Sequence, residues 1–246
     1  MPRLPKSTIG NAYTSDFCWS LLSDLTAVGS RMGGQRGEQR GAEIMRDAFE
    51  TVGLRDTRIS EFEIPGWWRG STSLTVEDAR TTTEWDRSHQ LLALPGTPAD
   101  TVSAELVDGD YGTPEELEKI TTDGTIVMVS NGAPDGYDRW LHRIEKYANV
   151  YERGAAGFVF RNDREGRLLP TGEIGYHSRP GPIPAVGVSL EVGENLHHRC
   201  DRGSVSVEMS VDCTNELTTS RNVEGVLGPP DGDEIELGTH ARRYAR

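Results

Sequence analysis

Apolar residues recur at helical spacing through the first fifty residues of the chain. Ser15 can cap a helix in which apolar positions recur every three or four residues and form one stripe: Phe17, Leu21, Leu25 and Val28. A glycine-rich break at residues 29–34 follows. A second helix then stops at Gly53 after placing a further apolar set on one face: Ala42, Met45, Phe49 and Val52. The pattern predicts two helices, each with one buried face.

From Thr57 onward the pattern changes to short extended runs separated by turn residues. Residues 57–64 alternate between polar and apolar, Pro65 and Gly66 interrupt them, and residues 72–77 resume the extended run. Five more runs are predicted to be strands: residues 103–107, 124–130, 157–160, 183–188 and 205–211. The middle of the chain is therefore expected to be rich in strands.

Two helices are predicted inside this strand-rich region. Thr113, Pro114 and Glu116 form a helix start, with a capping residue, a proline in the first turn and the glutamate of a capping box. A second helix, ending near Gly154, has this apolar face: Trp140, Leu141, Ile144, Tyr147, Ala148 and Tyr151. The changes of pattern divide the chain into three segments: residues 1–63, 64–215 and 216–246.

The last part of the chain reads as two strands joined by a turn. Residues 220–240 contain two extended runs around a Pro/Gly/Asp cluster, and the second run ends in His240. The C-terminal end of a strand is a usual place for a ligand-binding side chain in an α/β fold. His240 is therefore the candidate metal ligand, although the six residues that follow it contain three arginines.

Charge narrows the classes of partner. Asp and Glu number 39 against 26 Lys and Arg, for a formal net charge of -13, and arginine supplies all but three of the basic residues. Such a surface disfavours nucleic acid and anionic membranes as partners. It suits a protein in high salt, which favours a halophilic, cytoplasmic origin; an ordinary acidic protein from a GC-rich genome is the alternative. No apolar run is long enough for a membrane span, and no secretory signal is visible.

The cysteines and the remaining histidines give weaker signals. Cys18, Cys200 and Cys213 form no CxxC pair, and their odd number favours reduced, buried thiols. For His197 and His198, the surface end of a helix is favoured over a pair of ligands. Three other histidines are assigned to a polar helix side or to loops: His142, His89 and His177. The chain has no G-x-S-x-G elbow, and the break at residues 29–34 lacks the ending of a phosphate-binding loop.

Three blocks, in order, resemble a known family. Gly29-Ser30-Arg31, the glycine-rich turn and a helix ending at Gly53-Leu54 resemble the opening of the co-catalytic zinc aminopeptidases, the group of aminopeptidase S and glutamate carboxypeptidase II. Residues 220–223 and 233–240 resemble the next block of that family, whose histidine is its first zinc ligand. Residues 153–159 and 183–188 resemble a protease-associated (PA) domain inserted between the two blocks.

The resemblance implies an α/β fold: one incomplete half of a zinc-peptidase α/β sandwich with an inserted β-rich α+β PA domain. It also implies a zinc-dependent aminopeptidase that hydrolyses peptides with metal-activated water, uses two zinc ions and takes His240 as a metal ligand. Nucleic acid and membranes are not expected as partners. A non-catalytic PA-type module for peptide binding or protein interaction is the alternative.

The chain departs from the family pattern directly after His240. The family continues H-x-D-S, whereas this chain has Arg242 in place of the aspartate. The bridging aspartate, the Glu-Glu pair with the general base and the final histidine have no counterpart here. We therefore expect a truncated chain that is inactive by itself, contains no catalytic residue and binds no zinc, unless a separate polypeptide completes the site.

Overall fold

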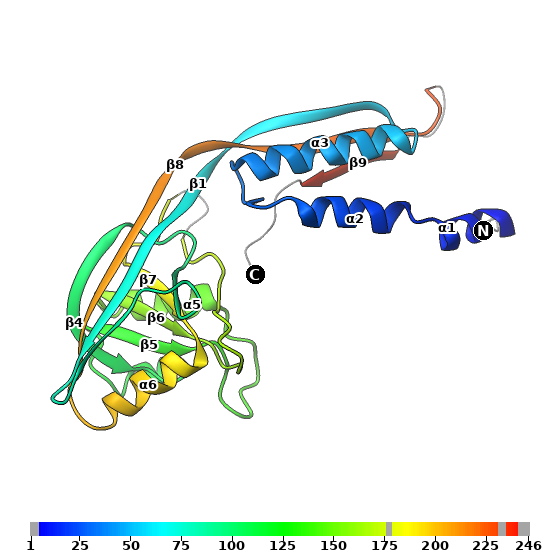
Figure 1. The fold of residues 1–246 in the computed structure, drawn as a ribbon. Coiled ribbons are helices and arrows are strands. Elements are labelled where there is room, and N and C mark those ends of the chain that lie inside the picture. Colours follow the sequence, from blue (N-terminus) through cyan, green and yellow to red (C-terminus); the bar gives the residue numbers. More distant parts are fainter. Residues whose placement is uncertain (1–4, 176–178, 231–234, 241–246) are drawn as a thin grey trace. The chain divides into compact units, whose positions relative to one another are not determined.

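The structure, a computed structural model, describes residues 5–175, 179–230 and 235–240. The chain divides into two compact units (Figure 1). Of the described residues, the first unit takes those up to Ile64 and those from Leu217 onward, and the second unit takes Pro65–Glu216. The expected α/β class is confirmed, since helices alternate with the strands of a nine-stranded sheet and the second unit is rich in strands.

The first unit is made of helices packed with the ends of long strands. Its elements are α1 (Lys6–Thr14), α2 (Phe17–Ala27), α3 (Arg36–Thr51), the start of β1 (Arg55–Glu77), the end of β8 (Ser206–Leu227), and β9 (Ile235–His240). β9 pairs antiparallel with β8, and Asn222 lies opposite His240. The two strands predicted within residues 220–240 are therefore confirmed.

Helix α3 packs its apolar side against β8. Ala42 and Val223 are fully buried and form a small core with three partly buried side chains: Met45, Phe49 and Ile59. Gly225 permits this close approach, because a Cβ there would come within 2.9 Å of the side chain of Leu54. The buried face predicted for the second helix is confirmed for Ala42, Met45 and Phe49, but it is wrong for Val52, which follows the end of α3 and is exposed.

The prediction for α2 is only partly right. The helix forms, but none of its residues is fully buried, and Cys18 and Trp19 are exposed. Its stripe from Phe17 to Leu25 is half-buried, and α2 packs against α3. Cys18 was expected to be a buried thiol, and that expectation is wrong. Helix α1 had no counterpart among the predicted elements.

The second unit is a mixed sheet with helices beside it. Its further elements are β2 (Thr82–Trp85), β3 (Leu91–Ala93), β4 (Asp100–Asp108), α4 (Pro114–Leu117), β5 (Ile126–Ser130), α5 (Arg143–Tyr151), β6 (Gly157–Arg161), β7 (Ala185–Val188) and α6 (Leu190–Cys200). The strand order is β2-β1-β8-β4-β5-β6-β7-β3. β4 to β7 are parallel, whereas β3 pairs antiparallel with β7 and β8 pairs antiparallel with β4.

The parallel strands form the main core. All residues of β5 are buried, as expected for a parallel strand covered on both faces. Phe158 of β6 packs edge-on against Tyr147 of α5 at 5.4 Å and stacks on Phe160 at 5.8 Å, measured between ring centroids. Aliphatic side chains of β5 and α5 complete this cluster: Val127, Val129 and Val150. The strand predictions for this region are confirmed, with shifts of a few residues at the ends.

The apolar face predicted for α5 is wrong in part. Leu141 and Tyr147 are buried, but Trp140, Ile144 and Tyr151 are exposed. The helix begins only at Arg143, after its N-cap residue His142, so Trp140 does not follow the helical period. Within the helix the buried side is that of Lys146, Tyr147 and Val150, which leaves Ile144 and Tyr151 exposed. His142 has a definite role, because its Nδ1 accepts a hydrogen bond of 3.2 Å from the backbone N–H of Ile144. The capping box predicted at Thr113 and Glu116 of α4 is confirmed.

The breaks predicted in the long strands are wrong. β1 continues through Pro65 and Gly66, and residues 205–211 and 220–227 belong to the single strand β8. Proline lacks a backbone N–H, so it fits only where no neighbouring strand needs that donor. β2 pairs with β1 only from Leu74 to Glu77, and it therefore leaves Pro65 without a partner on that side. In Figure 1, β1 (cyan) and β8 (orange) run beside one another as neighbours in the sheet.

Candidate functional site

A buried glutamate joins two of the sequence blocks in the first unit. Glu38 of α3 is fully buried and accepts hydrogen bonds from the backbone N–H of Gly34, at 2.7 Å, and from the backbone N–H of Arg221, at 3.2 Å. The hydroxyl of Ser220 donates a third hydrogen bond to the same carboxylate. The glycine-rich break and the Ser220 segment are therefore held together by one side chain, which the sequence analysis missed.

The helix start around Glu38 depends on close backbone contact. A Cβ on Gly37 would come within 1.9 Å of the carbonyl oxygen of Gly29, so only glycine fits there. Gly34 has a φ of +81° beside Thr218, which again favours glycine. The hydrogen bonds that the Glu38 carboxylate accepts come from groups that hold the fold together. The role of Glu38 is therefore structural and not catalytic.

His240 ends strand β9 opposite Asn222, and only its backbone is described. Its assignment as a metal ligand stays a prediction. A two-zinc centre needs several carboxylate and imidazole ligands together with a bridging carboxylate. This chain offers one imidazole there, followed in sequence by Ala241, Arg242 and Arg243. The donor set of these residues does not fit a two-zinc site.

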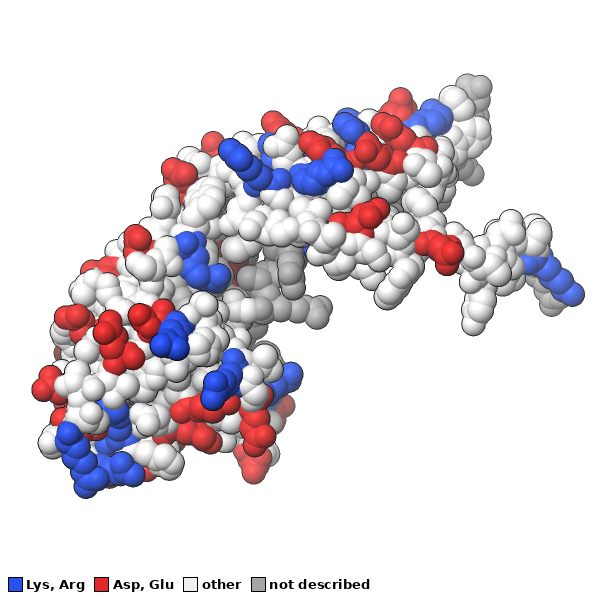
Figure 2. Space-filling view, viewed as in Figure 1, with Lys and Arg blue, Asp and Glu red and all other residues white. Residues whose placement is uncertain are grey.

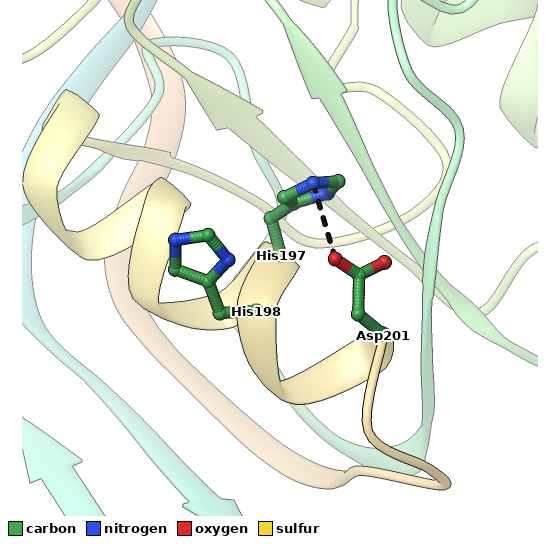
Figure 3. A group of neighbouring side chains, drawn as sticks. All are labelled: His197, His198 and Asp201. Atoms are coloured by element: carbon green, nitrogen blue, oxygen red, sulfur yellow. Dashed lines mark ion pairs between the residues drawn. The ribbon is translucent and has the colours of Figure 1, made fainter.

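Within the described residues, three potential metal ligands gather in one place, at the end of α6 in the second unit. His197, His198 and Asp201 each offer a ligand atom, and these atoms lie within 4.8 Å of one another (Figure 3). Nδ1 of His197 lies 2.6 Å from a carboxylate oxygen of Asp108, the last residue of β4. The expected position at a helix end is confirmed. No pattern along the chain pointed to Asp108, which is 89 positions away from His197.

A buried lysine is the most unusual charge of the second unit. Lys146 of α5 is fully buried, and its ammonium group donates hydrogen bonds to the carbonyl oxygens of Ser130, at 2.6 Å, and Gly132. Burial lowers the pKa of Lys146 from 10.5 to about 8, against the opposing effect of Glu116 and Asp163. Because Lys146 has no exposed surface and its ammonium group donates to backbone carbonyls, it connects α5 to the end of β5.

The lowered pKa predicts a pH-dependent contribution of Lys146 to stability. Between about pH 8 and 10.5 the unfolded chain binds the proton and the folded chain does not, so the free energy of unfolding rises with pH across this window. The total rise is at most about 3.5 kcal/mol, at about 1.4 kcal/mol per pKa unit. The free energy of unfolding is measured by denaturant for the wild type and for Lys146→Met, whose side chain cannot titrate. The value of the wild type relative to that of the variant should increase with pH across this window. A constant difference would contradict the lowered pKa.

One pocket of about 240 Å³ also lies in the second unit. Its lining residues are Trp85, Gln90, Arg167, Ser189, Glu191, Val192 and Asn195. The hydroxyl of Ser189 accepts the N-cap hydrogen bond of α6 from the N–H of Val192, and Glu191 accepts one from the N–H of Arg167. The polar groups are thus engaged in local structure, and the pocket is smaller than those that bind drug-sized ligands.

Two of the three thiols, those of Cys200 and Cys213, are not reactive. The three cysteines are free, as expected for reduced thiols. Burial raises the pKa of Cys200 to about 12, and it raises that of Cys213 as well, which keeps both protonated. His89 is exposed in a turn, and His177 lies outside the described residues. Acidic and basic side chains lie interspersed on the face drawn in Figure 2.

No helix among the described residues combines the length and the apolar character that crossing a lipid bilayer requires.

Comparison with known proteins places this geometry in context. The profile of the PA domain matches residues 102–196, which covers the sheet from β4 to α6. Mouse carboxypeptidase Q is 22% identical over 226 residues, covering 87% of this chain and 46% of that protein. The chain therefore spans about half the length of the curated relatives that it matches.

Solved structures share the fold over a similar extent. An aminopeptidase from Aneurinibacillus sp. has a TM-score of 0.65 at 20% identity, covering 88% of this chain and 48% of its own. A zinc aminopeptidase from Bacillus subtilis has a TM-score of 0.62 at 22% identity, with the same coverage. With the PA domain matched in the second unit and related sequence across both units, the chain is similar to the co-catalytic zinc peptidases that carry a PA domain.

Proposed function

We propose that this chain supplies the PA domain and the first zinc ligand, His240, of a metallopeptidase that hydrolyses peptides with metal-activated water. The observation that carries the proposal is the relationship to carboxypeptidase Q and to zinc aminopeptidases over 87–88% of the chain, across both units. The names of these relatives agree on peptide hydrolysis and differ in the end of the peptide that is cleaved. The proposal is therefore for peptide hydrolysis, with an aminopeptidase as the specific form.

The apolar surface of the first unit supports this assignment. Large apolar side chains are exposed on α1, α2 and β9: Ile9, Tyr13, Trp19, Leu22, Ile235 and Leu237. Large exposed apolar side chains mark surfaces that pack against other protein. The relatives are about twice as long as this chain. The second half of such a protein is therefore the partner that would cover these apolar side chains.

The 246 residues are proposed to be inactive by themselves. Hydrolysis by a metal-bound water requires three or more ligands and a general base. His240 brings one imidazole, and the described residues gather other potential ligands only at the end of α6. The remaining ligands must then come from protein beyond these residues, either a continuation of the same polypeptide or a separate one.

The first test assays the 246-residue chain with an aminoacyl-anilide and with a dipeptide, in added zinc or cobalt. No metal-dependent cleavage above background is expected, because the chain lacks the carboxylate ligands and the base. Metal-dependent cleavage by the wild type that disappears in His240→Ala would show instead that these residues form a working site.

The second test supplies the missing groups. We expect the DNA beyond the codon for His240, in one of its three frames, to encode the Asp, Glu-Glu and His blocks of the family. A protein that joins these blocks to the chain should cleave the same substrates. His240→Ala should lower that activity by about 100-fold or more, since the partners of metal ligands already contribute about 10- to 100-fold. An unchanged rate in His240→Ala would refute the assignment of His240.

A second candidate function is a non-catalytic PA-type binding module. It is favoured by one observation: the matched domain lies within a unit that has its own core around Phe158 and Val127. Peptide binding by the 246-residue chain, without any activity in the joined protein, would support this function over the peptidase.

A further inference from the structure

The last turn of α6 carries an arrangement of side chains that the peptidase assignment does not use. His197 and His198 are adjacent on the helix, and Asp201 follows one turn later, directly after its end. Nε2 of His197 lies 3.5 Å from a carboxylate oxygen of Asp201. Figure 3 shows the three side chains on the same side of this helix end.

Asp108 fixes how His197 can act. Its carboxylate lies 2.6 Å from Nδ1 of His197, and only 12% of its side chain is exposed. A carboxylate that accepts a hydrogen bond from Nδ1 holds the proton there and leaves Nε2 as a free electron pair. This is the support that proteins give to a histidine ligand of a metal ion.

The electrostatic surroundings favour a cation. The C-terminal end of a helix carries partial negative charge, and α6 ends at Cys200 beside Asp201. The neighbouring strand end adds Asp108 and Asp110.

We propose that His197, His198 and Asp201 bind a divalent transition-metal ion of the zinc class, with Asp108 as the group that orients His197. Imidazole nitrogen with carboxylate oxygen is a donor set that suits Zn²⁺, Ni²⁺ and Cu²⁺ and not Ca²⁺ or Mg²⁺. Three protein ligands leave a fourth position to water.

The geometry requires little movement. Two ligands of a tetrahedral ion at about 2.0–2.1 Å lie about 3.3 Å apart. The pair of His197 Nε2 and Asp201 already lies at 3.5 Å, so only the ring of His198 must turn inward. His198 is exposed, and its ring centroid lies 5.7 Å from that of His197, so rotation about its side-chain bonds is not obstructed by a buried position.

Cys200, although close in sequence, is not part of the site. Its thiol donates to the carbonyl oxygen of Leu106 at 3.7 Å, and burial raises its pKa to about 12, so it offers no thiolate. A metal ion bound to His197 would connect the end of α6 to the end of β4, because His197 also contacts Asp108. The metal ion would therefore have a structural role. The site lies wholly in the second unit and does not depend on the proposed peptidase activity.

The test measures zinc binding to tag-free, full-length chain that carries His240→Ala, so that the proposed peptidase ligand cannot contribute. Calorimetry is expected to give a stoichiometry of one zinc ion per chain. Cobalt(II) bound at the same site is expected to show the visible absorption band of an ion with low coordination number. Zinc should also raise the melting temperature. His197→Ala and His198→Ala should each lower the zinc association constant by more than about 10-fold, and Asp108→Asn by about 10- to 100-fold.

The matched control is His89→Ala, which removes an exposed histidine from the same unit and should bind zinc like the parent. Folding of each variant is checked by its melting temperature without metal. If Asp108→Asn changes that temperature but not the zinc affinity, the His197–Asp108 contact serves the fold alone and the proposal is overturned. Absence of stoichiometric binding, or binding that survives His198→Ala, would overturn it equally.

Discussion

Replacing Glu38 with alanine is expected to lower the free energy of unfolding of the first unit by about 3–5 kcal/mol. The change removes the acceptor of three hydrogen bonds and leaves the donors of Gly34, Ser220 and Arg221 without it in a buried place. Each such donor costs about 1–3 kcal/mol when unpaired. Hydrogen–deuterium exchange is the measurement of choice, with faster exchange expected in peptides from α3 and from the end of β8.

Two variants control for this result. Glu38→Gln keeps the size and one acceptor oxygen but turns an NH₂ group toward the donors, so an intermediate loss is expected. Glu50→Ala removes an exposed glutamate from the same helix and should change the free energy of unfolding by less than about 0.5 kcal/mol. Equal effects of Glu38→Ala and Glu50→Ala would mean that the buried carboxylate does not hold the two segments together.

Replacing Phe158 with alanine is expected to destabilise the second unit by about 3–5 kcal/mol. Phe158 is fully buried between Tyr147 and Phe160, so the change leaves a cavity in the middle of the parallel sheet. Urea unfolding, together with exchange in peptides from β5 and β6, measures the loss. The change should also make the central segment a target of limited proteolysis under conditions in which the wild type resists.

The controls for Phe158 vary volume and position. Phe158→Leu keeps an apolar branched side chain and should cost less than the alanine variant. Leu168→Ala removes an exposed leucine from the same unit and should leave stability within about 0.5 kcal/mol. A small effect of Phe158→Ala would show that the structure closes around the cavity, or that this cluster is not the core of the unit.

The features that the sequence predicted well are those with a local cause. The capping box of Thr113 and Glu116 spans four residues, and its hydrogen bonds form within them. The face of α3 follows from a helical period that Ala42, Met45 and Phe49 keep. Family resemblance, carried by short motifs in order, was confirmed by the match of the PA domain and by the relationship to zinc peptidases.

The errors share one cause, which is that exposure and strand length depend on neighbours. Pro65 ends a strand only where a neighbouring strand needs its missing N–H, and β2 begins to pair with β1 only at Leu74. The apolar residues before α5 follow no helical period because His142 caps the helix later than expected. Cys18 lies in an apolar helix, yet its side chain is exposed in the described part of the chain.

The sequence by itself determined most of the helices and strands, the family resemblance and the position of His240 at the end of a strand. Only the tertiary structure decided that Glu38 meets Ser220, 182 positions away, and that Asp108 meets His197. It also decided that Lys146 is buried and bonded to the carbonyls that end β5. Such contacts follow no period along the chain, because the strand order of the sheet and not sequence distance brings their partners together.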